Sequence, residues 1–220
     1  MANLLNLDPD QLLSTTRAVR FRLDLERPVP MNLIEECVAL AQQAPTGSNM
    51  QGWHFVVVTD ADKRKAVGDV YRRAFEVYKG LPVYAGAIHT GDAARDAQQG
   101  RVASSADYLG EHMGEAPVLV IPCVTGRVGS GDNVAMAAAG MMGAIIPAAW
   151  SFMLAARARG LGTCLTTLHL MFEQEVAEIL DIPFNEVSQA LLTPVAFTKG
   201  TDFKAASRPD PQSIMHIDGW

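Results

Sequence analysis

Apolar residues recur every three or four positions in three stretches of the chain. This spacing places them on one face of an α-helix, so each stretch predicts an amphipathic helix with that face inward. Asp8, followed by Pro9, and Asp60 are residues of the kind that cap helix starts, so we expect helices to begin there. The three stripes are Leu33, Ile34, Cys37, Val38, Leu40 and Ala41; Val67, Val70, Tyr71, Ala74, Phe75 and Tyr78; and Val176, Ile179 and Leu180.

Four shorter runs are rich in β-branched, aromatic and other apolar residues, a composition that favours strands buried in a sheet. They cover residues 53–58, 117–124, 163–168 and 187–198. Pro194 has no amide hydrogen to donate to a neighbouring strand, so we expect part of the last run to lie at a sheet edge or a bulge.

Two further stretches have unusual patterns. Residues 80–100 combine turn residues with weak periodicity and predict an irregular segment, either a lid or a surface excursion, before a helix that ends near Met113. Residues 134–156 carry no charged residue and are long enough to cross a bilayer, but they are rich in Ala, Gly and Met and contain Pro147. We interpret them as a buried helix in a core or a subunit interface, with a membrane anchor as the alternative.

Composition narrows the class of protein. The chain has 220 residues without a long linker or a repeat, and its 49% hydrophobic content is ample for one large core, so we expect a single domain over residues 1–220. A net charge of −6 without a basic cluster argues against a nucleic-acid partner. Cys37, Cys123 and Cys164 are odd in number and widely spaced, which indicates reduced core cysteines, and the N-terminus lacks a basic signal region. We expect a cytoplasmic protein.

The glycines and histidines of the chain do not match the spacing of known dinucleotide-binding or metal-binding motifs. Gly126, Gly129 and Gly131 follow a predicted strand, but their order is G-x-x-G-x-G rather than the G-x-G-x-x-G of dinucleotide-binding folds. The five histidines lack metal-ligand spacing, so we predict no metal site. Among them, His169 directly follows TCLTTL, residues 163–168, a segment whose threonines could face a ligand.

A polar loop lies between a predicted helix and strand in residues 44–58, APTGSNMQGWHFVVV. Pro45 ends the helix, and the next residues offer hydroxyls, amides and a permissive backbone that could hold a polar ligand. Two other segments add polar groups. Arg17, Arg20 and Arg22 in TTRAVRFR could bind a phosphate or complement a helix dipole, and the threonines of TCLTTL could present hydroxyls to a ligand or serve only as strand formers.

Taken in order, TTRAVRFR, APTGSNMQGWHFVVV, LAARARGLGTCLTTL and a late SRP resemble the nitroreductase family of FMN-dependent oxidoreductases. The resemblance implies an α+β fold with a mainly antiparallel central sheet flanked by helices, in an intertwined homodimer with FMN at the interface. The implied cofactor-binding residues are Arg17, Ala18, Arg20 and Arg208 near the phosphate and ribityl chain; Pro45, Thr46, Gly47, Ser48, Asn49 and Gln51 from the other subunit; and Thr166, Thr167 and Leu168 beside the isoalloxazine ring.

Three positions depart from the family pattern. Thr16-Arg17-Ala18 stands where the family commonly has Arg-Arg-Ser, so Arg20, Arg22 or Lys204 would compensate for a missing guanidinium. Gly52 replaces a frequent proline, and Trp150 replaces a polar residue of the long helix and would narrow the pocket.

The resemblance also implies an activity. NADH or NADPH would deliver a hydride to flavin N5, and a nitroaromatic, quinone or similar flat acceptor would then be reduced in a ping-pong cycle. Stabilising the reduced ring is an electrostatic task, so we name no catalytic side chain. The alternative is a flavin-binding protein without reductase turnover, used for storage, sensing or flavin breakdown.

Overall fold

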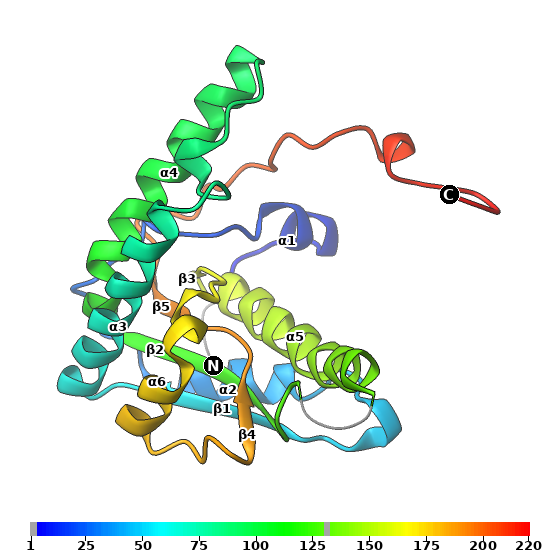
Figure 1. Cartoon of the computed structure of the whole chain (residues 1–220). Coiled ribbons are helices and arrows are strands. Elements are labelled where there is room, and N and C mark those ends of the chain that lie inside the picture. Colours follow the sequence, from blue (N-terminus) through cyan, green and yellow to red (C-terminus); the bar gives the residue numbers. More distant parts are fainter. Residues whose placement is uncertain (1–3, 130–132) are drawn as a thin grey trace.

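An antiparallel five-stranded sheet forms the centre of the fold (Figure 1). The computed structural model describes residues 4–129 and 133–220, so Gly131 of the glycine-rich turn lies outside the described residues. The strands run in the order β1-β2-β5-β3, and β4 also pairs with β2. Their bounds are β1 Trp53–Val58, β2 Val118–Thr125, β3 Leu161–Thr163, β4 Val187–Gln189 and β5 Thr193–Phe197.

Six helices surround this sheet within the described residues. They are α1 Pro9–Thr15, α2 Met31–Ala41, α3 Ala61–Lys79, α4 Ala93–His112, α5 Val134–Ala158 and α6 Glu173–Leu180. Short 3-10 turns cover Gly47–Asn49, Ala85–Ala87, Met113–Glu115, Leu168–Phe172 and Pro211–Ser213. The two predicted helix caps are confirmed, because Asp8 accepts a hydrogen bond from the Gln11 amide and Asp60 accepts one from the Lys63 amide.

Both faces of the sheet are covered, and the side chains of β2 show how. Val118 and Val120 are buried against α2 and α5, whereas Leu119 and Ile121 are buried in the core beneath α3 and α6. A strand covered on both faces needs apolar residues at successive positions, which explains the continuous apolar run in this part of the sequence.

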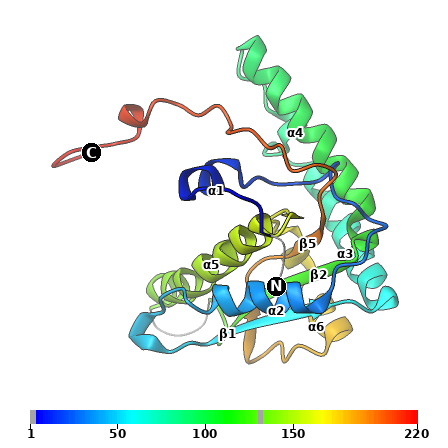
Figure 2. The same cartoon turned by 180° about the vertical axis from the view of Figure 1, so that it is seen from behind.

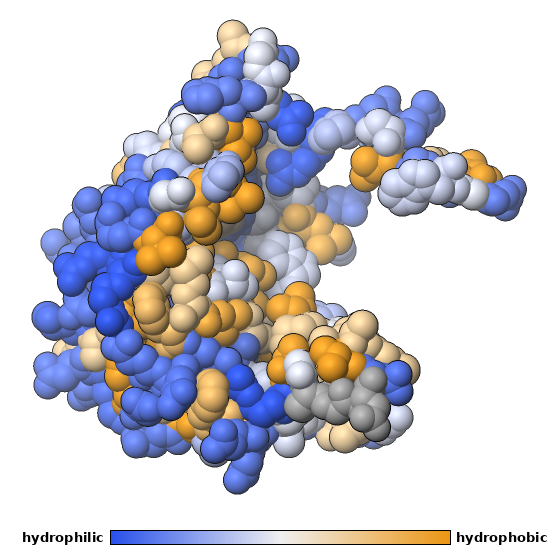
Figure 3. Space-filling model, viewed as in Figure 1, coloured by the Kyte–Doolittle hydropathy of each residue, from blue (hydrophilic) through white to orange (hydrophobic). Residues whose placement is uncertain are grey.

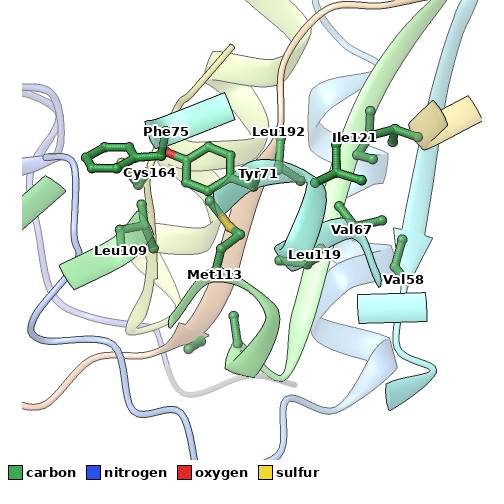
Figure 4. Close-up of a cluster of buried hydrophobic side chains, with 14 of the residues drawn as sticks. Val58, Val67, Tyr71, Phe75, Leu109, Met113, Leu119, Ile121, Cys164 and Leu192 are labelled. Atoms are coloured by element: carbon green, nitrogen blue, oxygen red, sulfur yellow. The ribbon is translucent and has the colours of Figure 1, made fainter. Parts of the chain in front are cut away.

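Two main groups of side chains make up the core, one on each face of the sheet. The group on the α3 side includes Val58, Val67, Tyr71, Phe75, Leu109, Met113, Leu119, Ile121, Cys164 and Leu192 (Figure 4). The group on the α2 and α5 side includes Leu33, Ile34, Cys37, Val118, Val120, Phe152, Met153, Ala156, Leu161 and Val195. The apolar stripes predicted for α2 and α3 therefore face the core, except for Leu40, which is 47% exposed.

All three cysteines are free and buried, as predicted. Burial raises the pKa of the Cys37 thiol to about 11 and that of Cys123 to about 12. Because the thiolate is the reactive form, these two groups are unreactive at neutral pH.

The third and fourth predicted strands differ from the expectation. The third, expected over residues 163–168, is wrong in position, because β3 covers Leu161–Thr163 and residues 164–168 leave the sheet apart from a bridge between Thr166 and Leu192. The run 187–198 is divided into β4 and β5, which pair with successive parts of β2. Although β5 lies between β2 and β3, Pro194 is paired on one side only, opposite Leu119, because the pairing with β3 ends at Val195; this is the local edge position expected for a proline.

The irregular segment predicted over residues 80–100 is confined to residues 80–92. Asp92 caps α4 by accepting hydrogen bonds from the amides of Ala94 and Arg95. The helix then continues to His112, close to the predicted end near Met113. Its start was missed because α4 has no strong apolar stripe and projects from the body of the fold (Figures 1 and 2).

Within one chain, helix α5 is buried over its C-terminal half only, so the core accounts for one half of the helix, and the subunit interface expected as the alternative stays a prediction for the other half. Phe152 and Ala156 are fully buried, whereas Val134 is 45% and Met136 is 72% exposed. Among the described helices, α5 is the one with the length and apolar content that a membrane span requires, a property that core helices share. Its apolar N-terminal half is therefore uncovered within one chain.

The C-terminal tail extends away from the sheet, past α4 and α1 (Figures 1 and 2). Its last residues carry exposed apolar side chains, including Ile214, Ile217 and Trp220. These apolar side chains are therefore uncovered within a single chain.

One close backbone crossing gives a test of the fold. A Cβ on Gly68 of α3 would lie 2.5 Å from the Gly114 Cα, so we expect Gly68→Ala to lower the free energy of unfolding by about 1–3 kcal/mol. Gly100→Ala on α4 is the matched control, because its Cβ would meet nothing within 4 Å, and it should raise stability by about 0.5–1 kcal/mol. Urea unfolding at one protein concentration measures both, and equal effects of the two substitutions would contradict this packing.

Candidate functional site

The N-terminal arginine segment is attached to the end of strand β3. The amide of Val19 donates a hydrogen bond of 2.8 Å to the Thr163 carbonyl, and Ala18 forms a parallel bridge with Thr163. Arg17 and Arg20 flank this bridge. The pairing brings the first segment of predicted site residues next to the third, although about 145 residues separate them in the sequence.

Thr166 is held firmly in place. Its amide and carbonyl form hydrogen bonds of 3.0 Å and 2.8 Å with Leu192, and its hydroxyl lies 3.1 Å from the hydroxyl of Tyr71. Tyr71 is buried in the core beside Cys164 (Figure 4), and this burial raises its pKa to about 12, so the phenol stays protonated at neutral pH. Leu165 and Thr167 are exposed on either side, so the three residues do not share one face.

A cavity of about 280 Å³ lies beneath this segment and opens between α3 and α4. Its wall combines aromatic and aliphatic groups with the hydroxyls of two threonines and one guanidinium. It is lined by Arg20, Tyr71, Phe75, Tyr78, Ala85, Val102, Ala106, Cys164, Leu165, Thr166, Thr167 and Leu168. The Arg20 guanidinium donates a hydrogen bond of 3.1 Å to the Ser105 hydroxyl on α4, which fixes one side of the cavity.

A second, larger cavity of about 700 Å³ is rich in cationic groups. It lies between the arginine segment, the first half of α4 and the start of the tail. It is lined by Arg17, Asp92, Ala94, Arg95, Gln98, Gln99, Arg101, Ala205, Ala206, Ser207, Arg208 and Pro209. Arg17 donates a hydrogen bond of 2.8 Å to the Lys204 carbonyl, which ties the arginine segment to the tail.

The two cavities are neighbours along α4, because Arg101 lines the larger one and the next residue, Val102, lines the smaller one. Guanidinium groups suit a phosphate, since each presents several donors to its oxygens. Aromatic and aliphatic walls with a few hydroxyls suit a flat heterocycle. The donor set of the two cavities therefore fits FMN, with Arg17 and Arg208 available to its phosphate and Arg20 with residues 166–168 available to its ring.

The polar loop that the sequence singled out lies apart from both cavities within one chain. Ser48, Asn49 and Gln51 adopt positive φ angles of 52°, 52° and 50°. The Gln51 amide group donates to the Asn49 side chain at 2.9 Å, and its backbone amide donates to the Thr46 hydroxyl at 3.1 Å. The turn Gly47–Asn49 packs beside α5. One chain thus brings together the first, third and fourth predicted segments but not the second.

The expected substitutes for the missing family arginine differ in availability. Arg22 is engaged elsewhere, with hydrogen bonds of 2.6 Å to Asp202 and 2.9 Å to the Lys199 carbonyl. Lys204 contributes its backbone carbonyl to Arg17 rather than lining the cavity with its ammonium group. Trp150 is 37% exposed on α5 and lines neither cavity, so its narrowing of the pocket stays a prediction for a dimer.

Four polar residues of α4 that line the larger cavity were missed by the sequence reasoning, namely Arg95, Gln98, Gln99 and Arg101. The first three belong to the segment 80–100 that was read as irregular, and Arg101 follows it directly. Recognising a capped polar helix after Asp92 would have placed them on one element. Tyr71 and Phe75 were assigned to the core, and the structure shows that they also line the smaller cavity.

His169 lies just beyond the threonine segment and is completely buried. Its ring nitrogens have no hydrogen-bond partner within residues 4–129 and 133–220. Burial lowers its pKa to about 4, although the nearby Glu173 carboxylate acts in the opposite direction. No cluster of His, Cys, Asp or Glu side chains in the described part of the chain could hold a metal ion.

Residues 13–196 match the family model described as the Nitroreductase family. The chain therefore belongs to the nitroreductase family, as its motifs suggested.

Relatives show the range within this family. The 4-nitrobenzoate reductase of Nocardioides sp. (strain LMS-CY) is 29% identical over 199 residues, covering 79% of this chain and 74% of that enzyme. Iodotyrosine deiodinase 1 of Rattus norvegicus is 34% identical over 67 residues, covering 30% of this chain and 23% of the deiodinase, so that match spans less than a quarter of the relative. The FMN-dependent nitroreductase NfnB from Mycobacterium smegmatis, solved with NADPH, shares the fold with a TM-score of 0.67 at 19% identity, covering 94% of this chain and 96% of that one.

The buried His169 predicts a loss of stability in mild acid. The unfolded chain binds a proton at this residue below about pH 6.5, whereas the folded chain binds it only near pH 4, so the free energy of unfolding should fall by up to about 3 kcal/mol across this window. His169→Leu should make stability less dependent on pH between these values, as measured by urea unfolding. The exposed His89, changed to Gln, is the control and should keep the parent's pH profile. An unchanged profile in His169→Leu would contradict the burial of a neutral imidazole.

Proposed function

We propose that this protein is an FMN-dependent oxidoreductase that takes electrons from NADH or NADPH and passes them to a flat aromatic acceptor. The observation that carries the proposal is the adjacency of two cavities, one cationic and one largely apolar, formed by the segments that resemble the family's cofactor motifs. Membership of the nitroreductase family supports the same cofactor and reaction class.

FMN would supply the redox chemistry, accepting a hydride equivalent and returning it to a second substrate. The chain's own residues bind and orient. Arg17 and Arg208 would hold the phosphate, and Arg20, fixed by Ser105, would place a positive charge at the ring site. The backbone of Thr166, which is hydrogen-bonded to Leu192, would keep the wall of the smaller cavity rigid. No side chain acts as a nucleophile in this scheme.

A homodimer would complete the site. The exposed face of α5 contains small and apolar residues, and a Cβ added at Gly140 or Gly143 would meet nothing within 4 Å, so another chain can approach closely. The loop Pro45, Thr46, Gly47, Ser48, Asn49 and Gln51 lies beside this helix and would then reach the partner's cavities. Such a dimer would also cover the exposed apolar groups of the tail.

The Nocardioides relative is a 4-nitrobenzoate reductase, which supports a nitroaromatic acceptor, and the structural neighbour NfnB was solved with NADPH, which supports a nicotinamide reductant. We propose one cytoplasmic, flavin-binding domain without a nucleic-acid or membrane partner.

A second candidate is reductive dehalogenation of an aromatic substrate. It is favoured by the 34% identity to iodotyrosine deiodinase 1 over 67 residues. A flavoprotein without turnover is the third possibility. Anaerobic mixing with NADPH or NADH separates these functions: bleaching of the flavin excludes the third, and a panel of nitro, quinone and iodinated phenol acceptors distinguishes the first two by which compound restores the oxidised spectrum.

Cofactor binding is tested directly by the visible spectrum of the purified protein. We expect flavin absorbance, either as purified or after incubation with FMN, and Arg17→Gln should weaken FMN binding by about 10- to 100-fold because one charge-assisted hydrogen-bonding group is lost. Arg72→Gln on α3, which removes an exposed arginine paired with Asp69, is the control and should leave FMN affinity unchanged. A parent protein that binds no FMN would refute the proposed function.

The N-terminal half of α5, which is uncovered in one chain, would lie in the dimer interface. Met136→Glu should place a charge in the interface and weaken dimerisation by roughly tenfold or more, with parallel loss of FMN. Val83→Glu alters another exposed apolar residue, away from α5, and should leave both properties unchanged. Analytical ultracentrifugation gives the oligomeric state and absorbance gives the bound flavin. A monomer that retains FMN would contradict a site shared between subunits.

A further inference from the structure

The larger cavity holds more positive charge than one phosphate group requires. Four arginines line it, namely Arg17, Arg95, Arg101 and Arg208, together with one carboxylate, Asp92. The whole chain has a net charge of −6, so this local excess of cations opposes the general composition. Such a concentration of guanidinium groups favours an anionic ligand.

The single carboxylate of the cavity is already engaged. Asp92 caps α4, and one of its oxygens accepts hydrogen bonds of 2.8 Å and 3.0 Å from the amides of Ala94 and Arg95. Within residues 4–129 and 133–220, Arg95 and Arg101 form no ion pair with an acidic side chain. Both side chains are exposed to the cavity and are available to a ligand.

The arginines fall into two groups by position. Arg17 and Arg208 belong to the segment beside β3 and to the tail, and they suffice for a phosphate monoester, which carries about two negative charges at neutral pH. Arg95 and Arg101 both belong to α4, on the opposite wall. The second group is therefore free to bind a second anion.

The position of this second group indicates what kind of anion it meets. Arg101 is followed directly by Val102, which lines the smaller cavity with Tyr71 and Phe75. Adjacent helical residues differ in height by only about 1.5 Å but are turned by about 100° around the helix axis, so α4 forms a wall of both cavities and Arg101 stands at the level of the site for flat rings. A substituent on an aromatic ring meets this requirement. The 2′-phosphate of NADPH is many bonds away from the nicotinamide ring and does not meet it as directly.

We propose that Arg95 and Arg101 form an anion subsite that selects aromatic acceptors bearing a carboxylate. This inference rests on the proposed oxidoreductase function and narrows its substrate class. A planar carboxylate can accept paired hydrogen bonds from a guanidinium, and Gln98 and Gln99 add neutral donors to the same wall. Figure 3 shows hydrophilic and apolar groups side by side on the face of the molecule where the tail passes α4.

The test compares two ligands of nearly the same shape on the FMN-loaded protein. Isothermal titration calorimetry with 4-nitrobenzoate and with neutral 4-nitrobenzamide should show about tenfold or greater preference for the carboxylate. The double variant Arg95→Gln/Arg101→Gln should lose this preference with little change for the amide. Arg95→Lys/Arg101→Lys should restore part of it, and Arg72→Gln, an exposed arginine on α3, should retain it. Raising the salt concentration should reduce the preference of the parent, because exposed charges are screened.

Several outcomes would overturn the subsite without affecting the proposed function. One is that the parent protein binds FMN and its flavin is reduced by NADPH or NADH, but the protein binds 4-nitrobenzoate and 4-nitrobenzamide with equal affinity. Another is a double variant that loses FMN itself, which would assign both arginines to the cofactor phosphate. A third is a double variant that keeps the carboxylate preference but no longer distinguishes NADPH from NADH, which would assign them to the reductant.

Failure of the proposed function gives a different result. If the parent binds no FMN, the same titration is performed on the protein as purified. A carboxylate preference that depends on Arg95 and Arg101 would then support the subsite, whereas its absence would overturn the subsite as well.

Discussion

The backbone pairing at Thr163 is the constraint on which the candidate site depends. Its carbonyl accepts a hydrogen bond from Val19, and its own strand pairs with β5 at Val195. One residue thus joins the N-terminal arginine segment to the central sheet. Because a buried backbone group must find a partner, this pairing fixes the path of the chain on both sides of it. Arg17 and Arg20 are placed beside the threonine segment as a result.

Packing on the α3 side of the sheet then shapes the smaller cavity. Tyr71 and Phe75 contribute to the core with one part of their rings and to the cavity wall with another. Core side chains are closely packed and hold fixed rotamers, so the hydroxyl of Tyr71 has a fixed position next to Thr166. The same residues therefore stabilise the fold and define the site, and a substitution here would affect both properties.

The two cavities differ in charge, and the proposed dimer would supply the polar loop that one chain keeps away from them. Guanidinium groups gather where the tail passes α4, whereas the adjoining cavity presents rings and hydroxyls. The polar loop over residues 45–51 lies beside α5, whose N-terminal half exposes apolar side chains. Burial of that surface against a second copy would offset its exposure to water and bring a polar loop to each cavity. Cofactor binding and dimerisation would then be coupled.

The sequence by itself determined the helices with clear apolar stripes, the capped starts at Asp8 and Asp60, the β1 and β2 strands and the family. These features depend on local spacing or on motifs of adjacent residues, which can be read without knowing the fold. Tertiary structure decided the rest. The end of β3 at Thr163, the division of residues 187–198 between β4 and β5, and the role of α4 in the larger cavity depend on partners far away in the chain. A polar helix such as α4 has no periodic signal, because its function comes from what it faces and not from an apolar stripe of its own.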